Sequence, residues 1–530
     1  MGDWHGPRGP FDIPDVPDYV PRRLKPWLFI FFVLIVQLSG GIYLAAATDM
    51  VGSTALMRED ILMAGYASLV GMSVNFAVMF RLKFRFSNRV GLLVCGAVLI
   101  AANFICANTT SVPLLVATCF AAGWFRMWAT FVCNSTIQLW LTPVRDMAVF
   151  FCYVYLVVDG VIQLSGIATI YTAFFSRWEY MHWIVIGLLA FMMLMVLIFV
   201  KPVKGPLQIP LLGVDWIGAA LWSVFMLCFT FICVYGNFYD WWKSEEIAGA
   251  AILSAVCLAI NLWRASFLRH PYISFAAMTN RNVVRAGLIY MVFFTLTATE
   301  HVFEHSYAAA ILGFDEPNLI DLNWYVFAGI IAGCAFTYFT FALHKWRYKT
   351  MTAIAFAFAA IYLSWFYFMI DYGVEKEMLL FPLFIRGVAS VIISIVFLTS
   401  IVQSGLDFFV FPQALTINGF TGAVMGATLG PALIGELLRH TIAENAELIS
   451  VRFTDFHAVT AHIPMSRLYG IVQQQALVVS MKEIYGWLLI GAILSLAIIA
   501  VCYGSLRPSA IFPKWRTIRK IFRKEAKSAF

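Results

Sequence analysis

The chain of 530 residues is strongly apolar, with 62% hydrophobic and only 12% charged residues. A soluble globular domain carries roughly 45–50% apolar and about 25% charged residues. The composition therefore disfavours a soluble enzyme, a disordered chain and a nucleic-acid binder. It favours a polytopic helical membrane protein, because each membrane-spanning helix needs roughly 20 apolar residues. Long continuous apolar runs also differ from the alternating pattern of a membrane β-barrel.

We expect about fourteen membrane-spanning helices, and an even number places both termini on one side of the membrane. The N-terminus is acidic and rich in proline, so it does not match a cleavable signal peptide, which begins with basic residues. The predicted spans are 26–49, 61–81, 90–107, 111–141, 147–175, 181–200, 215–236, 247–263, 283–310, 322–344, 350–370, 380–402, 412–437 and 484–506.

The distribution of basic residues predicts the orientation. With the N-terminus inside, the inner segments hold 26 of the 36 lysines and arginines, and the outer segments hold eight. Cytoplasmic loops of membrane proteins carry such an excess of positive charge. We therefore predict that both termini are cytoplasmic. The net charge of +7 then needs no nucleic acid or other polyanionic ligand.

The ten cysteines all lie inside or at the rim of apolar runs. This placement supports neither a disulfide framework nor a zinc site. The sequence also lacks a convincing nucleophile or metal triad, so we expect no enzyme, no cofactor and no resident metal.

Two ionisable side chains lie deep within consecutive spans. Such a group costs about 3 kcal/mol or more at the centre of a bilayer, which makes it a functional candidate. Arg126 is 15 residues, about 22 Å, from the inner end of its span, and Asp159 is 12 residues, about 18 Å, from the inner start of the next. We expect them to meet near mid-membrane. A pair that opens during transport could bind and release a proton, whereas a static pair would only fix helix packing.

A second cluster of ionisable residues lies on the ninth predicted span, at Glu300, His301, Glu304 and His305. Glu300 and Glu304 are four residues apart and share one helical face. Arg386, on the twelfth span, lies at a depth similar to that of Glu300. A Glu300–Arg386 pair would therefore correspond to the Arg126–Asp159 pair, and histidine suits a proton relay because its pKa lies near 6.5.

Other interpretations of this cluster remain open. The segment from His301 to His305 matches the H-x-x-E-H pattern of zinc peptidases, although no third ligand occurs at a suitable spacing. Together with Glu300 and Glu304, the two histidines could instead serve a transporter of a metal ion or metal chelate. A third possibility is an outer vestibule with no role in coupling.

Glycine recurs every four residues at Gly422, Gly426 and Gly430, and Pro431 follows. Small residues at this period let helices approach closely, and proline permits a kink. The pattern predicts either a helix that rocks against its neighbour or one that packs tightly without moving.

Two segments outside the predicted spans are distinctive. A long outer loop, 438–482, contains helix-like stretches. The C-terminal tail, 507–530, is basic and amphipathic. The tail suits the anionic inner surface of a membrane, although a tail that only follows the charge rule would have the same composition.

Several motifs resemble the fourteen-span drug:proton antiporter branch of the major facilitator superfamily, of the multidrug-resistance protein B type. Gly426–Pro431 resembles its G-x-x-x-G-P pattern, and Asp215-Trp216-Ile217-Gly218-Ala219 resembles the D-W-x-G-A start of its first additional span. Other similar segments are Ser176-Arg177-Trp178-Glu179-Tyr180, Tyr235-Gly236 with Trp241-Trp242-Lys243-Ser244, and Gln474-Gln475-Ala476.

The chain also departs from this family's pattern. The segment 81–89 keeps only the basic residues of the G-x-L-x-D-R-x-G-R loop. Ser39 stands roughly where the family has an aspartate, and the arginine of the fourth span is displaced to Arg126. The G-P-x-x-G-G motif of the fifth span is reduced to Gln163-Leu164-Ser165-Gly166.

The resemblance implies an all-α major facilitator fold. Its expected parts are a cytoplasmic segment at 1–25, six-helix halves at 26–200 and 265–506, two additional helices at 201–264, and the cytoplasmic tail at 507–530. In that fold the first, second, fourth and fifth helices of each half line a central cavity and access alternates by rocking. These are the helices that carry Arg126, Asp159, Glu300 and Arg386.

The function implied is a proton-coupled secondary active transporter in the bacterial inner membrane that exports amphipathic organic compounds or drugs. We expect Asp159 and Glu300 to carry protons, with Arg126 and Arg386 as counter-charges. The expected partners are a small-molecule substrate, protons, the lipid bilayer and, through loop 438–482, a periplasmic adaptor protein.

Overall fold

The computed structural model describes the chain from residue 15 to residue 502. Within this range every regular element is helical, as predicted for an all-α membrane protein. The description leaves out residues 18, 22–23, 41, 46, 48–49, 52–55, 143–145, 204–210, 302–306, 308–310, 315, 405, 408 and 455–463.

Eleven helices of the described chain are long and apolar enough to cross a membrane. A twelfth candidate is the pair α4 (Arg58–Asn75) and α5 (Met79–Arg85), which is bent by 66°. The eleven spans contain α6 (Asn88–Asn108), α7 (Val112–Leu141), α8 (Met147–Phe175), α9 (Glu179–Phe199), α10 (Trp216–Tyr235), α11 (Glu245–Phe267), α15 (Glu316–Thr337), α16 (Tyr348–Met369), α17 (Lys376–Val402), α19 (Ala427–Thr454) and α21 (Met465–Cys502). The spans of α15 and α19 also include the short elements that adjoin these two helices.

Two shorter helices lie at the remaining positions where spans were expected. They are α1 (Lys25–Leu38), with 14 residues, and α13 (Arg281–Thr297), with 17. The expected span 283–310 is an α-helix as far as Thr297 and continues as a 3₁₀ turn, η3 (Ala298–His301), whereas 302–306 and 308–310 lie outside the described residues. In η3 the Thr299 hydroxyl forms a hydrogen bond of 2.7 Å with the Tyr362 hydroxyl of α16.

Short elements connect or extend the long helices. Two of them, η5 and η6, are π-helical segments in which each turn is wider than in an α-helix. The short elements are α2 (Ile42–Ala45), η1 (Leu211–Gly213), η2 (Trp241–Lys243), α12 (Phe275–Met278), η5 (Tyr338–Leu343), α18 (Phe411–Gly419) and η6 (Phe420–Gly426).

We refer to α1–α9 as the first half and to α13–α21 as the second half. In each half, two helices cross closely through glycine. In the first half, a Cβ atom added at Gly71 of α4 or Gly123 of α7 would overlap the backbone of the facing helix. In the second half, Gly329 of α15 and Gly387 of α17 have the same relationship. Since only glycine allows this approach, each helix pair is held at short range.

Helices α10 and α11 form a hairpin between the halves, and α10 contacts both α4 and α19. Asp215 starts α10, because its carboxylate accepts a hydrogen bond of 2.9 Å from the Gly218 amide. The same carboxylate forms an ion pair of 2.6 Å with Arg264 near the end of α11. The segment Asp215–Ala219 thus begins one helix and fastens it to the next.

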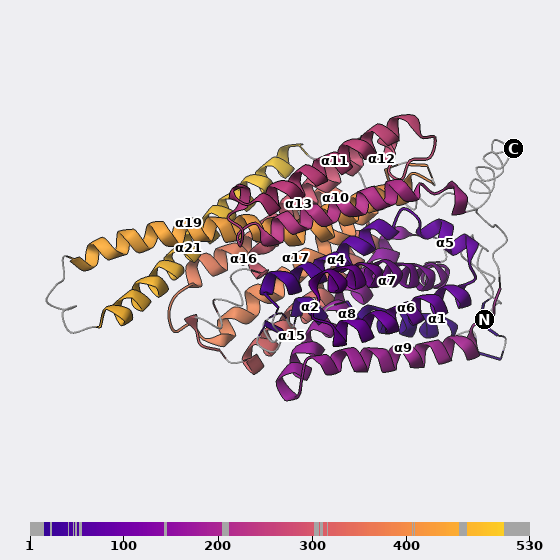
Figure 1. Cartoon of the computed structure of the whole chain (residues 1–530), viewed down its shortest axis with the longest axis horizontal. Coiled ribbons are helices and arrows are strands. Elements are labelled where there is room, and N and C mark those ends of the chain that lie inside the picture. Colours follow the sequence, from indigo (N-terminus) through magenta and orange to yellow (C-terminus); the bar gives the residue numbers. More distant parts are fainter. Residues whose placement is uncertain are drawn as a thin grey trace.

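The segment 438–482, expected as a long loop, is largely helical. Helix α19 continues to Thr454 and α21 begins at Met465, so the two helices project together beyond the bundle (Figure 1). No proline interrupts the chain between Pro431 and Pro464, and alanine, leucine and glutamate, which are good helix formers, are frequent there. We call the projecting parts of α19 and α21 the outer hairpin.

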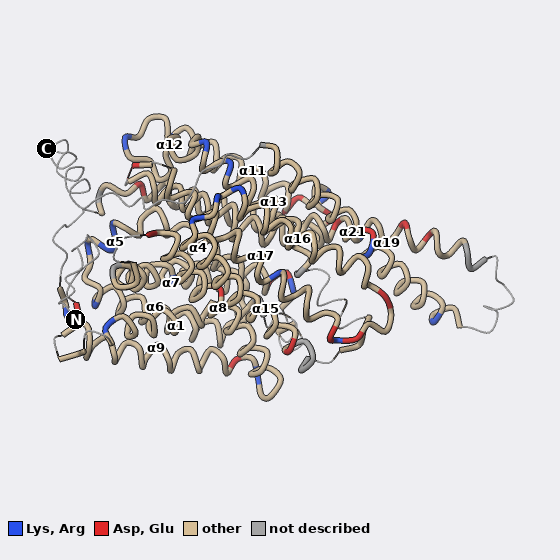
Figure 2. The backbone as a smooth tube through the Cα atoms, turned by 180° about the vertical axis from the view of Figure 1, so that it is seen from behind, with Lys and Arg blue, Asp and Glu red and all other residues tan. Residues whose placement is uncertain are grey.

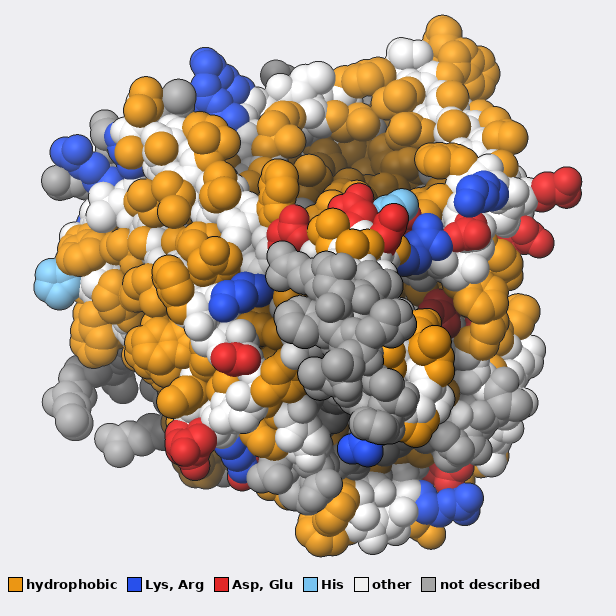
Figure 3. Space-filling model, turned by 90° about the vertical axis from the view of Figure 1, so that its left-hand side faces the viewer, with side chains coloured by type: hydrophobic (Ala, Val, Ile, Leu, Met, Phe, Trp, Pro, Cys, Tyr) orange, Lys and Arg blue, Asp and Glu red, His pale blue; other side chains and the backbone are white. Residues whose placement is uncertain are grey.

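The distribution of charge agrees with a membrane-embedded bundle. Charged segments concentrate toward the two ends of the molecule, and lysines and arginines are frequent at the end opposite the outer hairpin (Figure 2). Seen from the end that carries the outer hairpin, hydrophobic side chains are frequent around the rim, and charged side chains are scattered among them (Figure 3). Following the orientation that the sequence predicts, we call the hairpin end the outer end and the opposite end the inner end.

Candidate functional site

A cavity of about 500 Å³ lies between the two halves. Its walls come from α1, α4, α7 and α8 in the first half, and from α13, α15, α17 and the α18–α19 segment in the second. Counted by the expected spans, these are the first, second, fourth and fifth helices of each half. The cavity is therefore a central one shared by both halves.

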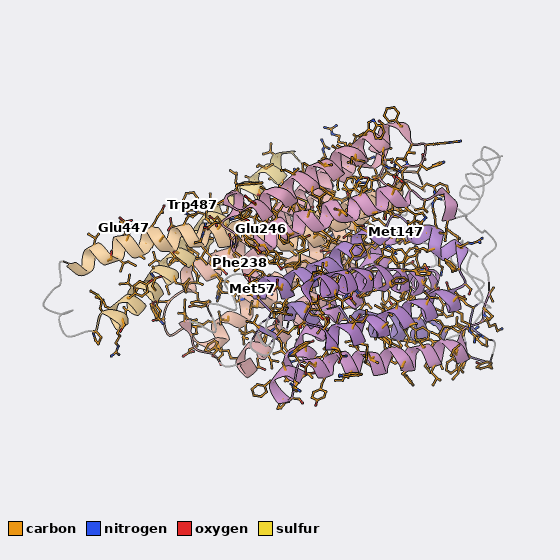
Figure 4. The ribbon with its side chains drawn as sticks, in the orientation of Figure 1. Met57, Met147, Phe238, Glu246, Glu447 and Trp487 are labelled. Carbon is orange, nitrogen blue, oxygen red and sulfur yellow. The ribbon has the colours of Figure 1, made fainter. Side chains whose placement is uncertain are left out.

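The cavity extends from the middle of the bundle toward its inner end. Its lining includes Phe80 of α5, Gln138 near the end of α7, Met147 at the start of α8 and Phe411 at the start of α18. Figure 4 shows Met147 far along the bundle from Met57, which precedes α4 at the outer end. The helix ends that line the cavity are thus those expected to face the cytoplasm.

The cavity wall is mainly apolar, with polar groups at intervals. Four methionines line it, and their flexible, polarisable side chains adapt to ligands of different shape. Several phenylalanines and a set of amide and hydroxyl side chains complete the wall. The methionines are Met72, Met79, Met127 and Met147, and the amides are Gln37, Asn134, Gln138, Gln163 and Asn418.

Asp159 is half-buried on α8 and lines this cavity. Within the described chain, no hydrogen bond or ion pair joins its carboxylate to another side chain. Beside it, the hydroxyls of Tyr155 (α8) and Tyr290 (α13) lie close enough to interact with each other. Tyr290 also forms a hydrogen bond of 3.0 Å with Ser394 of α17. A short chain of hydroxyls therefore crosses from one half to the other next to the carboxylate.

Arg126 lies outside the cavity lining and is 2% exposed. Its Nη2 atom donates to Ser68 Oγ at 3.1 Å and lies 2.7 Å from Met72 Sδ. A side chain at Gly40 would overlap its guanidinium. No ion pair joins Arg126 to Asp159 in the described chain, so the two residues are not the contacting pair that their depths predict. The reason is that α7 packs mainly on α4, whereas α8 packs mainly on α15.

Arg386 of α17 is 5% exposed and lines the cavity. Its expected partner cannot be placed, since the side chains of Glu300 and His301 lie outside the described residues. Glu304 and His305 lie outside them entirely. Among the residues that are described, no group of three or more His, Cys, Asp and Glu could hold a metal ion.

The glycines of the thirteenth predicted span face α13. A Cβ atom at Gly422 would overlap the Tyr290 ring, and one at Gly426 would lie 2.8 Å from Phe294 Cβ. Gly430 is packed against Ala298 in the same way. The helix is π-helical through Gly426, and Pro431 lies inside α19. The glycine stripe therefore brings a widened helix against the tyrosine that neighbours Asp159.

Polar contacts join the two halves at the inner end of the bundle and also nearer its outer end. At the inner end, Lys345 forms an ion pair with Asp146. Nearer the outer end, Gln163 of α8 donates to Asn323 of α15 at 3.2 Å. Each contact would have to break for the halves to separate at its own end of the bundle.

A buried polar network lies at the inner end of the first half. The Lys83 ammonium is 1% exposed and donates to Asn88 Oδ1 at 2.6 Å and to Thr136 Oγ1 at 3.3 Å. Asn88 donates in turn to the buried Asp15 carboxylate. The segment 81–89 contains no aspartate of its own, and Asp15 of the N-terminal segment accepts a hydrogen bond from its Asn88.

The sequence predictions missed Tyr155, Tyr290 and Ser394. Tyr155 precedes Asp159 by four residues, a spacing that places two side chains on one helical face, so this signal was present in the sequence. The contact of Tyr155 with Tyr290 joins α8 to α13, and no local pattern predicts it.

Comparisons with known proteins bear on the fold. No family model matches the chain. A segment of 95 residues is 27% identical to an MFS-type transporter of a Penicillium species, and it covers 18% of this chain and 17% of that protein.

Solved transporter structures resemble nearly the whole chain. A crystal structure of the peptide transporter POT has a TM-score of 0.58 and 11% identity, covering 90% of this chain and 94% of that one. The nucleoside transporter NupG has a TM-score of 0.54 and 13% identity, covering 90% and 99% of the respective chains. A bacterial homologue of the human drug peptide transporters has a TM-score of 0.57 and 11% identity, covering 91% and 99%. The chain thus adopts the major facilitator fold.

Proposed function

We propose that the protein is a proton-coupled secondary active transporter that exports amphipathic organic compounds by alternating access. The observation that carries the proposal is the position of Asp159, a carboxylate in the wall of a cavity that both halves share. An ionisable group at this depth is costly and faces a water-accessible path. The major facilitator fold supports a rocking motion of the halves around such a cavity.

Asp159 is the proposed proton carrier. Its carboxylate lies in the wall of the cavity, where a proton can reach it through water in the cavity. The hydroxyls of Tyr155, Tyr290 and Ser394 link this site to the second half. Protonation of Asp159 would therefore change the contacts between the two halves.

The second proposed proton site contains Glu300, with Glu304, His301 and His305 as a relay and Arg386 as a counter-charge. Arg386 in the cavity wall supports this assignment. We also propose Arg126 as a counter-charge. Its guanidinium contacts Met72, which lines the cavity, and does not contact Asp159 directly.

The cavity supports an amphipathic substrate. Its volume of about 500 Å³ falls in the range of roughly 300–1,000 Å³ that is typical of sites for drug-sized ligands. Methionine and aromatic side chains offer an adaptable apolar surface, and Asp159 would favour a substrate with a cationic or hydrogen-bond-donating group.

We place the protein in the bacterial inner membrane with both termini in the cytoplasm. The excess of basic residues at the end opposite the outer hairpin supports this orientation. In this placement the outer hairpin projects into the periplasm, where it would contact an adaptor protein.

The test is transport in proteoliposomes with an imposed pH gradient and a cationic amphipathic dye. Asp159→Asn should abolish dye movement driven by the proton gradient, while binding of the dye, measured by fluorescence, persists. Asp159→Glu, which keeps the carboxyl group, should retain part of the activity. Asp321→Asn is the matched control, because Asp321 is exposed and pairs with Lys376. Gradient-driven transport by Asp159→Asn at the wild-type rate would refute the proposal.

A further inference from the structure

Cys106 and Cys119 lie side by side on neighbouring antiparallel helices. Their Sγ atoms, on α6 and α7 respectively, are 3.9 Å apart. Both side chains are buried, with exposed fractions of 5% and 4%. A disulfide requires the sulfurs to approach to about 2.05 Å, so the existing separation leaves an approach of roughly 2 Å.

The pair lies near the end of the helix hairpin that α6 and α7 form. Cys106 is two residues from the end of α6, so its Cα is about 3 Å from that end along the axis. It also lines a small cavity of about 130 Å³, together with Thr109, Trp178 and Glu179. The Cys106 sulfur therefore borders a cavity at the end of the bundle, through which a small reagent can approach it.

This end of the bundle is the outer one in the proposed orientation. The compartment outside a bacterial inner membrane is oxidising, and disulfides persist there, whereas cytoplasmic thiols are kept reduced. The inference below rests on this part of the proposed function.

We propose that Cys106 and Cys119 form a disulfide bond in the mature protein. The oxidant is a protein or small molecule that carries a reactive disulfide. One cysteine thiolate attacks that disulfide and forms a mixed disulfide, and the second cysteine thiolate then displaces the remaining thiol. The two cysteines lose two electrons and two protons, and the disulfide of the oxidant is reduced to two thiols.

The bond would fix the register of α7 against α6. Cys119 precedes Arg126 by seven residues, so the two side chains lie on the same face of α7, two turns apart. The cross-link would therefore anchor the outer part of the helix that holds the buried Arg126 guanidinium against α4.

Two-step alkylation of the full-length protein in its native membrane tests the proposal. Cells are quenched in acid, denatured in the presence of N-ethylmaleimide, reduced, and treated with deuterated N-ethylmaleimide, and the cysteine peptides are identified by mass spectrometry. We expect Cys106 and Cys119 to carry mainly the deuterated reagent. Cys95 and Cys133 lie on the same two helices toward the inner end and are fully buried; they should carry the first reagent.

A matched variant separates a disulfide from other forms of protection. In Cys119→Ser, Cys106 has lost its partner and should carry the first reagent. The proposal is overturned if both cysteines of the wild type carry the first reagent, or if Cys106 stays protected in Cys119→Ser.

A further treatment distinguishes the reasons for failure. If the wild-type pair is reduced in cells, the purified protein is incubated with oxidised glutathione. Formation of the bond under these conditions would show that the proposed orientation is wrong while the geometry holds. Absence of the bond would show that the two thiols cannot join, with no consequence for transport.

Discussion

Lys345 and Asp146 form an ion pair that joins the two halves at the inner end of the cavity. Asp146 also starts α8, since its carboxylate accepts a hydrogen bond of 3.1 Å from the Ala148 amide. Lys345 has a positive φ of 53° in the segment between η5 and α16. The helix that carries Asp159 therefore begins at the residue that connects the halves.

Removing this ion pair should favour opening at the inner end. A partly exposed pair is worth about 0–1 kcal/mol, so Lys345→Ala should shift the population of open molecules by up to about fivefold. Faster hydrogen exchange at the start of α8 would report this shift. Asp146→Asn should give the same result, because asparagine still caps the helix but lacks the charge. Unchanged exchange in both variants would contradict this role.

Gly422→Ala should destabilise the protein. The added methyl group would overlap the Tyr290 ring, and this ring cannot move freely because it stacks on Phe397 with a centroid distance of 4.4 Å. Overpacking of this kind typically costs about 1–3 kcal/mol. The expected result is a lower melting temperature in detergent and slower transport. Gly249→Ala is the control, because no atom lies within 4 Å of the added group; equal melting temperatures for both variants would count against the packing argument.

Tyr290→Phe should weaken the coupling between Asp159 and the second half. The change removes the hydroxyl that bonds to Ser394 and neighbours the Tyr155 hydroxyl, and it keeps the ring that packs on Phe397. Each neutral hydrogen bond contributes about 1 kcal/mol, so the protein should still fold. We expect slower proton-driven dye transport with dye binding unchanged. Tyr325→Phe, at an exposed position, should behave like the wild type.

Asp240 should fasten the α10–α11 hairpin to α19 only while it is ionised. Arg439 Nη1 donates to Asp240 Oδ1 at 2.5 Å, and this hydrogen bond lowers the pKa of Asp240. The contribution is therefore complete above the unfolded pKa, near 3.9, and is lost as the pH falls through the lower folded value.

At pH 7, Asp240→Asn should reproduce the effect of acid. The expected result is faster hydrogen exchange in the turn that contains Phe238 and Trp241, with no change in the start of α10. Glu246→Gln is a suitable comparison, since Glu246 is close to this turn (Figure 4) but contacts Ser244 rather than α19. Wild-type exchange in Asp240→Asn would show that the contact is not stabilising.

The sequence predicted the helical class and the position of most spans, because an apolar run of sufficient length has few alternatives in a membrane. It did not predict where helices end. The apolar run beyond Thr297 predicted an uninterrupted helix, whereas α13 ends there and the 3₁₀ turn η3 follows. The outer segment 438–482 contains charged residues, so it was predicted as a loop, although its helix-forming residues extend α19 and α21 instead.

The predicted depths of Arg126 and Asp159 follow from helical rise, but depth does not define which neighbour a side chain faces. Consecutive helices need not be the main packing partners, and here α7 and α8 pack on different elements. Asp159 consequently lines the cavity while Arg126 faces Ser68 on α4. The hydroxyl chain through Tyr290 depends on contacts between distant helices, which one sequence does not specify.

The length of α21 has a practical consequence. Its 38 residues extend over about 57 Å, nearly twice the roughly 30 Å thickness of a bilayer core. A detergent micelle or nanodisc would therefore leave part of the helix, together with its partner α19, standing clear on one side. Transporters without water-exposed domains look almost featureless in electron micrographs. The projecting parts of α19 and α21 would be visible outside the micelle, so the images of single particles could be aligned on them.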